Sequence, residues 1–139
     1  MNRNIEIGLL ITRLVLGIIF LVHGIVKFRD GIGNISGWFD SIGIPGFAAY
    51  IVAIIELVGG LALIVGFGTR IVSILLAIVM AGAIFKVKLA AGFLGNGQVA
   101  GYELDLALLA IALLLALSGS RLLALDRALP GSRSATLNS

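Results

Sequence analysis

Residues 7–28 of this chain, IGLLITRLVLGIIFLVHGIVKF, form a long and almost uninterrupted apolar segment. Only three of its 22 side chains are ionisable, namely Arg13, His23 and Lys27. A helix of this length is about 33 Å long at 1.5 Å per residue, enough to cross the ~30 Å hydrocarbon layer of a bilayer. The stretch therefore predicts a transmembrane helix.

Three further stretches have the same character, and they lie at 47–67, 71–91 and 104–122. Across all 139 residues the chain is 60% hydrophobic and 12% charged, with a mean hydropathy of +1.16. Water cannot solvate so much aliphatic surface, whereas 19 glycines suit the close approach of helices in lipid. The sequence predicts an all-α integral membrane four-helix bundle over residues 1–126, followed by a polar, disordered C-terminal tail at 127–139.

The segment between the first two stretches predicts a short additional helix. Ile35, Trp38, Phe39 and Ile42 follow helical spacing, with polar residues between them. Such a pattern is typical of an amphipathic helix in the membrane interface, with Trp38 at headgroup level. The alternative is a loop whose apolar side chains plug the mouth of the bundle.

The glycine-rich segment at 92–101 connects the third and fourth stretches. It contains no Lys-Ser/Thr pair and precedes no amphipathic helix start, so it is not a phosphate-binding loop. A flexible connector is the simpler interpretation, and a flap over the mouth of the bundle is the other.

The distribution of charge predicts how the chain is oriented. Four crossings place both termini on one side, which holds six basic and two acidic side chains, against four of each on the other side. The positive-inside rule then predicts that the N and C termini are cytoplasmic. The compact design fits a bacterial inner (cytoplasmic) membrane. Basic residues flank the spans instead of forming a stripe, which argues against nucleic acid as a partner, and the absence of cysteine excludes thiol and iron–sulfur chemistry in this chain.

Ionisable side chains within or beside the predicted spans indicate where a functional site would lie. A charge at the bilayer centre costs ~2.5–3.5 kcal/mol on insertion scales, so each such residue needs a partner, a ligand or water. We expect these groups to face the interior of the bundle; they are Arg13, His23, Lys27, Glu56, Lys86, Glu103 and Asp105.

The depth of each group in its span suggests two sets. Arg13 and Glu56 lie towards the middle and are predicted to form a buried pair, whose simpler role is to fix helix register. The remaining groups are expected to share a polar pocket in the outer half. Simpler structural roles compete there as well, since histidine can bond between helices, lysine can snorkel to the interface, and Glu103 and Asp105 can cap the fourth helix.

Imidazole, ammonium and carboxylate groups beside aromatic walls suit a quinone or catechol, whose oxygens exchange protons on redox change. The aromatic walls would come from Phe20, Phe28, Trp38, Phe85 and Phe93. We predict His23, Glu56 and Lys86 as catalytic residues and assign binding to a second set, namely Arg13, Phe20, Lys27, Trp38, Glu103 and Asp105. The sequence contains no metal, flavin or haem signature, although His23 could serve as one haem ligand with Met80 on another helix.

Several spaced motifs carry a resemblance to a known family. They are R-L-x-L-G-x-x-F-x-x-H-G-x-x-K-F at 13–28, G-x-P at 43–45, E-x-x-G-G-x-x-L-x-x-G-x-x-T-R at 56–70 and G-Y-E-x-D-L-x-L at 101–108, with Lys86 and Gly92-Phe93 between them. Over residues 7–125 the chain resembles the DoxX family of small bacterial membrane proteins. The resemblance implies four membrane helices and a link to quinone-dependent oxidation, to catechol or quinone stress, or to redox complexes with soluble enzymes.

Three functions are therefore compatible with the sequence. The first is a membrane redox accessory or oxidoreductase-type protein that binds a quinone-like molecule and acts with a soluble partner protein. The second is a small oligomeric channel or transporter for a small solute. The third is a membrane scaffold that recruits soluble redox enzymes. In each case we expect a homo-oligomer in the lipid bilayer.

Overall fold

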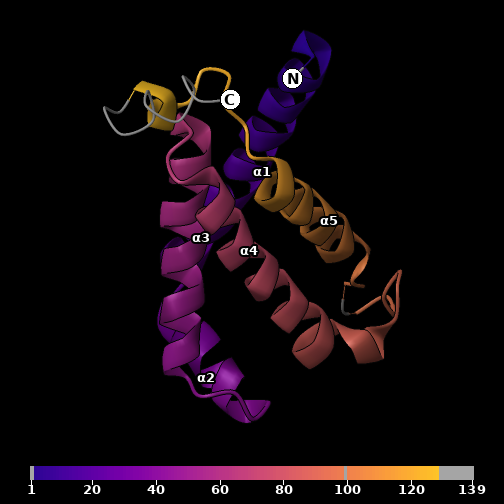
Figure 1. Ribbon diagram of the computed structural model, residues 1–139. Coiled ribbons are helices and arrows are strands. Elements are labelled where there is room, and N and C mark those ends of the chain that lie inside the picture. Colours follow the sequence, from indigo (N-terminus) through magenta and orange to yellow (C-terminus); the bar gives the residue numbers. More distant parts are fainter. Residues whose placement is uncertain (1, 99, 129–139) are drawn as a thin grey trace.

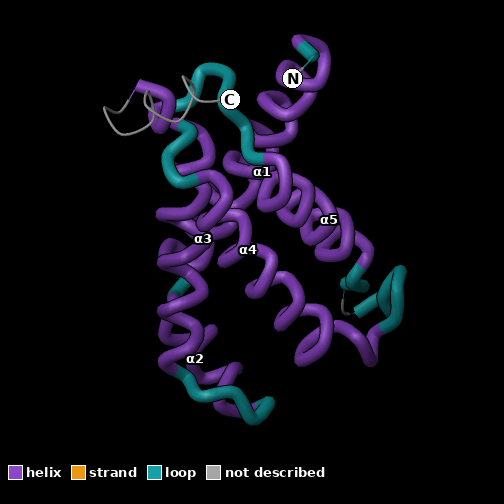
Figure 2. Tube along the Cα trace, in the orientation of Figure 1, coloured by secondary structure: helices purple, strands orange, loops and turns teal. Residues whose placement is uncertain are grey.

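The computed structural model describes residues 2–98 and 100–128, and most of this part of the chain is helical (Figure 2). Loops gather mainly at the two ends of the molecule. The helices follow in the order α1 (Arg3–Arg29), α2 (Ile32–Ser41), α3 (Phe47–Val65), α4 (Thr69–Ala83), the π-helix η1 (Ile84–Lys88), the 3-10 helix η2 (Leu89–Ala91), α5 (Glu103–Ser118) and the 3-10 helix η3 (Leu125–Ala128).

The bundle is built from two helical hairpins. In the first hairpin α1 packs against α3, and in the second α4 packs against α5, with α3·α4 and α1·α5 contacts joining the two. The start of α1 and the short helix η3 lie at one end of the bundle, whereas α2 lies at the other (Figure 1). We call these the terminal end and the α2 end.

Glycines set the register of the first hairpin. A Cβ added at Gly24 of α1 would lie 2.7 Å from the backbone nitrogen of Leu57, and one added at Gly17 would lie 2.8 Å from the carbonyl oxygen of Gly60. Real side chains do not tolerate such contacts, so α1 and α3 approach this closely only because these positions carry no side chain. Gly24 is therefore level with Leu57, and Gly17 is level with Gly60.

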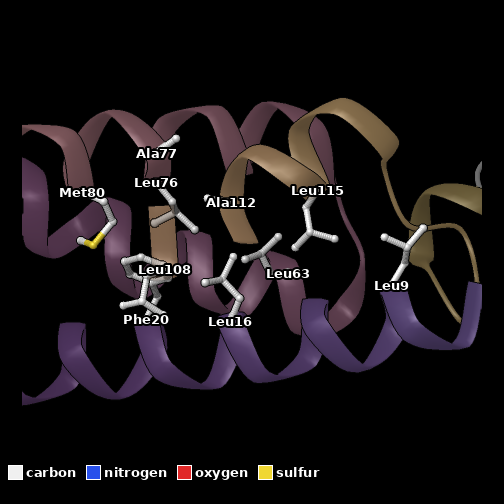
Figure 3. Close-up of a cluster of buried hydrophobic side chains, with 10 residues drawn as sticks. All are labelled: Leu9, Leu16, Phe20, Leu63, Leu76, Ala77, Met80, Leu108, Ala112 and Leu115. Carbon is white, nitrogen blue, oxygen red and sulfur yellow. The ribbon is translucent and has the colours of Figure 1, made fainter. Parts of the chain in front are cut away.

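The core is a single apolar cluster to which four helices contribute (Figure 3). Outward-facing side chains are equally apolar, since Ile54, Ile71 and Ile78 are 51%, 69% and 63% exposed. A soluble protein would not expose such rows of isoleucine, but lipid solvates them well. The buried cluster consists of Leu9, Leu16, Phe20, Leu63, Leu76, Ala77, Met80, Leu108, Ala112 and Leu115.

The protein is a four-helix membrane bundle. Within the described part of the chain, three helical segments are long and apolar enough to cross a bilayer, and they are Arg3–Arg29, Phe47–Val65 and Thr69–Ala91. The fourth helix, α5, has 16 residues and is about 24 Å long at 1.5 Å per residue. It ends at Ser118, before the predicted limit at residue 122, because Gly119 adopts a positive φ of 67° and turns the chain.

The predicted helix between the first two spans is confirmed as α2, which packs on α3 and α1. Its polar side chains hold the turn into α3, since the Ser36 hydroxyl donates to the Gly46 carbonyl at 2.9 Å and Asp40 accepts from the Gly46 amide at 2.8 Å. Trp38 is left 48% exposed.

The glycine-rich segment folds back on itself through an isolated bridge between Gly95 and Ala100 and an edge-to-face contact of Phe93 with Tyr102. The predicted domain boundary after Asp126 falls within η3. The rest of the predicted tail, residues 129–139, lies outside the described residues.

Candidate functional site

The first hairpin contains a buried ion pair. Nζ of Lys27, in the last turn of α1, lies 2.6 Å from Oε2 of Glu56 on α3. The Glu56 side chain is 4% exposed and that of Lys27 is 23% exposed. Both charges are thus largely withdrawn from solvent, and each is compensated by the other.

The prediction that Arg13 pairs with Glu56 is wrong. The register of the hairpin explains this result, because Gly24 is level with Leu57 and therefore Lys27, not Arg13, is within reach of the neighbouring Glu56. Arg13 lies 14 residues before Lys27, about four helical turns along α1, towards the terminal end.

Arg13 instead binds the backbone that follows α5. Its side chain is completely buried, and its guanidinium donates to the carbonyls of Ser120, Leu122 and Leu123 at 3.1–3.2 Å and to the Ser120 hydroxyl at 3.3 Å. Irregular backbone survives at membrane depth only where protein satisfies its polar groups. Arg13 satisfies the backbone carbonyls of the segment that follows the shortened fourth helix.

Asp126 anchors the same segment to the turn between α3 and α4. Its carboxylate accepts from the Gly68 amide at 2.7 Å, and its own amide donates to the Gly66 carbonyl at 3.2 Å. A Cβ added at Gly66 would lie 2.6 Å from Ala124. The segment after α5 is therefore tightly docked across the terminal end of the bundle.

His23 is exposed on the outer surface of α1, not within the bundle interior as predicted. The next residue, Gly24, lies in the interface between α1 and α3, so His23 is placed at the edge of that interface. The Nδ1 atom of His23 lies 2.7 Å from the carbonyl oxygen of Ile19, and a carbonyl only accepts. Nδ1 is therefore the donor in this contact, and in a neutral imidazole the other ring nitrogen, Nε2, is then the acceptor.

The second hairpin repeats the lysine–carboxylate arrangement. Nζ of Lys88, at the end of the π-helix η1, lies 2.9 Å from Oδ2 of Asp105 in the first turn of α5, with the side chains 27% and 9% exposed. Lys88 was not among the residues predicted to form the site, and this pair was not predicted. The signal was present, since each hairpin carries a lysine late in its first helix and a carboxylate in its second.

The five polar groups that were predicted to share one pocket do not converge in the structure. Lys27 is paired within the first hairpin and Asp105 within the second, whereas Lys86 and Glu103 are exposed on the second hairpin. Lys86 does not face the interior because the helix changes from α to π at Ile84, which alters the direction of the side chains that follow.

The aromatic residues predicted to line the pocket also lie in different parts of the structure. Phe20 is 1% exposed and belongs to the apolar core beside Leu108 (Figure 3), whereas Trp38 lies on the exposed side of α2. The residues that the structure brings together are therefore Lys27 and Glu56, with His23 one turn before Lys27 on the same helix.

Comparison with known proteins identifies relatives of this chain. A family model described as DoxX matches residues 8–89. The chain is 50% identical over 126 residues to "Putative oxidoreductase CatD" of Bacillus subtilis (strain 168), with 91% of this chain and 90% of that protein covered. No solved structure matches the chain significantly.

Two further relatives are named as membrane proteins. "Uncharacterized membrane protein Rv3486" of Mycobacterium tuberculosis is 38% identical over 129 residues, which cover 84% of this chain and 78% of that protein. "Inner membrane protein YqjF" of Escherichia coli (strain K12) is 33% identical over 70 residues, about half of each chain. The motifs, the helical membrane bundle and these matches agree, and the chain belongs to the DoxX family of membrane proteins.

Proposed function

We propose that this protein binds a quinone- or catechol-type molecule at the α2 end of the first hairpin and acts in redox chemistry together with a partner protein. The observation that carries the proposal is the partly buried Lys27–Glu56 pair with the exposed His23 one turn away on α1. A similar protein named as an oxidoreductase, 50% identical to this chain, supports the same class of chemistry.

The exposure of His23 suits a ligand that arrives through the bilayer. A quinol or catechol is soluble in lipid and can approach the outer surface of α1 sideways, without a channel from water. Its hydroxyl would donate to Nε2, which is the free acceptor of the neutral imidazole. Imidazole exchanges protons near neutral pH, so His23 is the proposed proton acceptor.

Lys27 and Glu56 have complementary roles in this proposal. The Lys27 side chain is 23% exposed, so its ammonium can contact the oxygen that becomes negative when the hydroxyl loses its proton. The Glu56 side chain, only 4% exposed, compensates the charge of Lys27 and fixes its position at 2.6 Å.

Oxidation of one quinol releases two electrons and two protons. In the proposed reaction the first proton passes to His23 and the second to water at the membrane surface. The two electrons pass to a flavin of the partner protein, which is thereby reduced, and the quinol leaves as a quinone. The proposed location is a bacterial inner membrane with both termini in the cytoplasm, which places His23 in the outer half.

The test is direct measurement of quinol binding by the purified protein in lipid nanodiscs. Quenching of Trp38, the single tryptophan, reports binding at the α2 end. We expect His23→Ala and Glu56→Gln each to weaken binding of a short-chain ubiquinol at least tenfold. Arg29→Gln is the matched control, because it removes a charge at the same end from an exposed pair with Asp30. Binding that is equal in all four proteins would contradict the proposal.

A further inference from the structure

Lys86 differs from the other lysines of the bundle. Lys27 and Lys88 are each held by a carboxylate, at 2.6 Å and 2.9 Å. Lys86 is exposed, and within residues 2–98 and 100–128 none of the ion pairs includes it. A lysine near the end of a membrane span extends its ammonium to the interface, where a negative charge from outside the chain can pair with it.

A shallow, open depression lies beside this lysine on the surface of the bundle. It has a volume of about 300 Å³ and is lined by Phe85, Lys86, Val87, Leu89 and Ala90, all from one short stretch of the chain. We call it the Lys86 hollow. Phe85 and Leu89 are 69% and 52% exposed, so its surface is strongly apolar. Within the π-helix η1, Lys88 pairs with Asp105 whereas Lys86 is left exposed.

The depth of Lys86 specifies the kind of ligand. The segment Thr69–Ala91 has 23 residues and is about 34 Å long, slightly more than the ~30 Å of hydrocarbon. Lys86 lies five residues before its end, about 8 Å along the helix axis. A lysine at this depth extends its ammonium to the boundary between acyl chains and headgroups, while its stem stays among apolar groups.

We propose that the Lys86 hollow binds the phosphate of an anionic phospholipid in the leaflet at the α2 end. The ammonium pairs with the phosphate, and the acyl chains lie over Phe85 and Leu89. Zwitterionic lipids offer a phosphate too, but their own choline or ethanolamine cation compensates it, so the unpaired lysine favours a lipid with net negative charge.

The test is native mass spectrometry of the full-length protein released from mild detergent. Phosphatidylglycerol and phosphatidylcholine are offered in equal amounts, and the retained lipid is counted. We expect about fivefold preference for phosphatidylglycerol, the factor that one lysine near an anionic surface supplies. Lys86→Gln should abolish the preference, and Lys86→Arg should retain it. Arg29→Gln, a charge removal at the same end, should leave it unchanged.

Two results would overturn the proposal. One is a preference that Lys86→Gln does not change, given an unaltered far-UV circular dichroism spectrum. The other is displacement of the lipid by millimolar inorganic phosphate, which would mean that the hollow recognises a soluble anion. Neither result depends on quinol binding near His23, because the two readouts concern different hairpins.

Discussion

Removal of one member of the Lys27–Glu56 pair should destabilise the bundle much more than removal of both. Breaking a buried ion pair by deleting one partner costs ~3–5 kcal/mol, because the remaining charge is left unpaired. Lys27 is 23% exposed and lies in the last turn of α1, where water reaches part of its stem. We therefore reduce this expectation to about 2–3 kcal/mol for Lys27→Met.

The double variant Lys27→Met with Glu56→Leu leaves no charge behind. Replacement of a buried pair by apolar residues of similar volume is often close to neutral. We expect the free energy of unfolding to return to within about 1 kcal/mol of the wild-type value. The difference between the double variant and the sum of the single variants measures the coupling of the two side chains.

The assay is equilibrium unfolding in mixed micelles of dodecyl maltoside and sodium dodecyl sulfate, followed by far-UV circular dichroism. Arg29→Met serves as the control, since the Arg29 and Asp30 side chains are 69% and 59% exposed and their pair should contribute little. Single-variant effects that add within about 0.5 kcal/mol would refute the reasoning, because they would show that the two charges do not stabilise one another.

Three further outcomes follow from the packing. Gly24→Ala should destabilise the first hairpin by about 1–3 kcal/mol, because its Cβ meets the Leu57 backbone, whereas Gly8→Ala, with no atom within 4 Å, should be neutral in the same unfolding assay. Arg13→Lys should expose the segment after α5 to limited proteolysis in nanodiscs, since one ammonium cannot replace a guanidinium that donates to several carbonyls; an unchanged cleavage pattern would argue against the docking role. Asp105→Asn should destabilise the second hairpin, and combining it with Lys88→Gln should cost less than the sum of both changes, as judged by a thermal-melt cycle.

The membrane fold could be predicted from the sequence because hydropathy over about 20 residues is a strong signal. The same holds for α2, whose apolar residues recur at helical spacing. Both signals are local, so they do not depend on how the helices dock. The early end of α5 was harder to predict, because the sequence alone does not show that Gly119 ends the helix.

The partners of the charged residues could not be predicted, because they depend on register between helices. Depth along the sequence suggested Arg13 for Glu56, but the contacts of Gly17 and Gly24 with α3 place Lys27 there instead. On the second hairpin a π-helix alters the helical phase, which no periodicity argument anticipates. Lys88 therefore pairs and Lys86 does not.

The bonds of Arg13 link the first membrane helix to the last part of the described chain. Its acceptors lie 107 to 110 residues later in the sequence, so Arg13 is translated long before the residues whose carbonyls accept its hydrogen bonds. During synthesis α1 must enter the bilayer with a charge that costs ~2.5–3.5 kcal/mol and lacks these acceptors. Its integration becomes secure only after residues 120–123 have been made. Nascent chains that stop before Ser120 should therefore leave α1 open to extraction and degradation, which makes synthesis of this segment a quality-control step in the biogenesis of this protein.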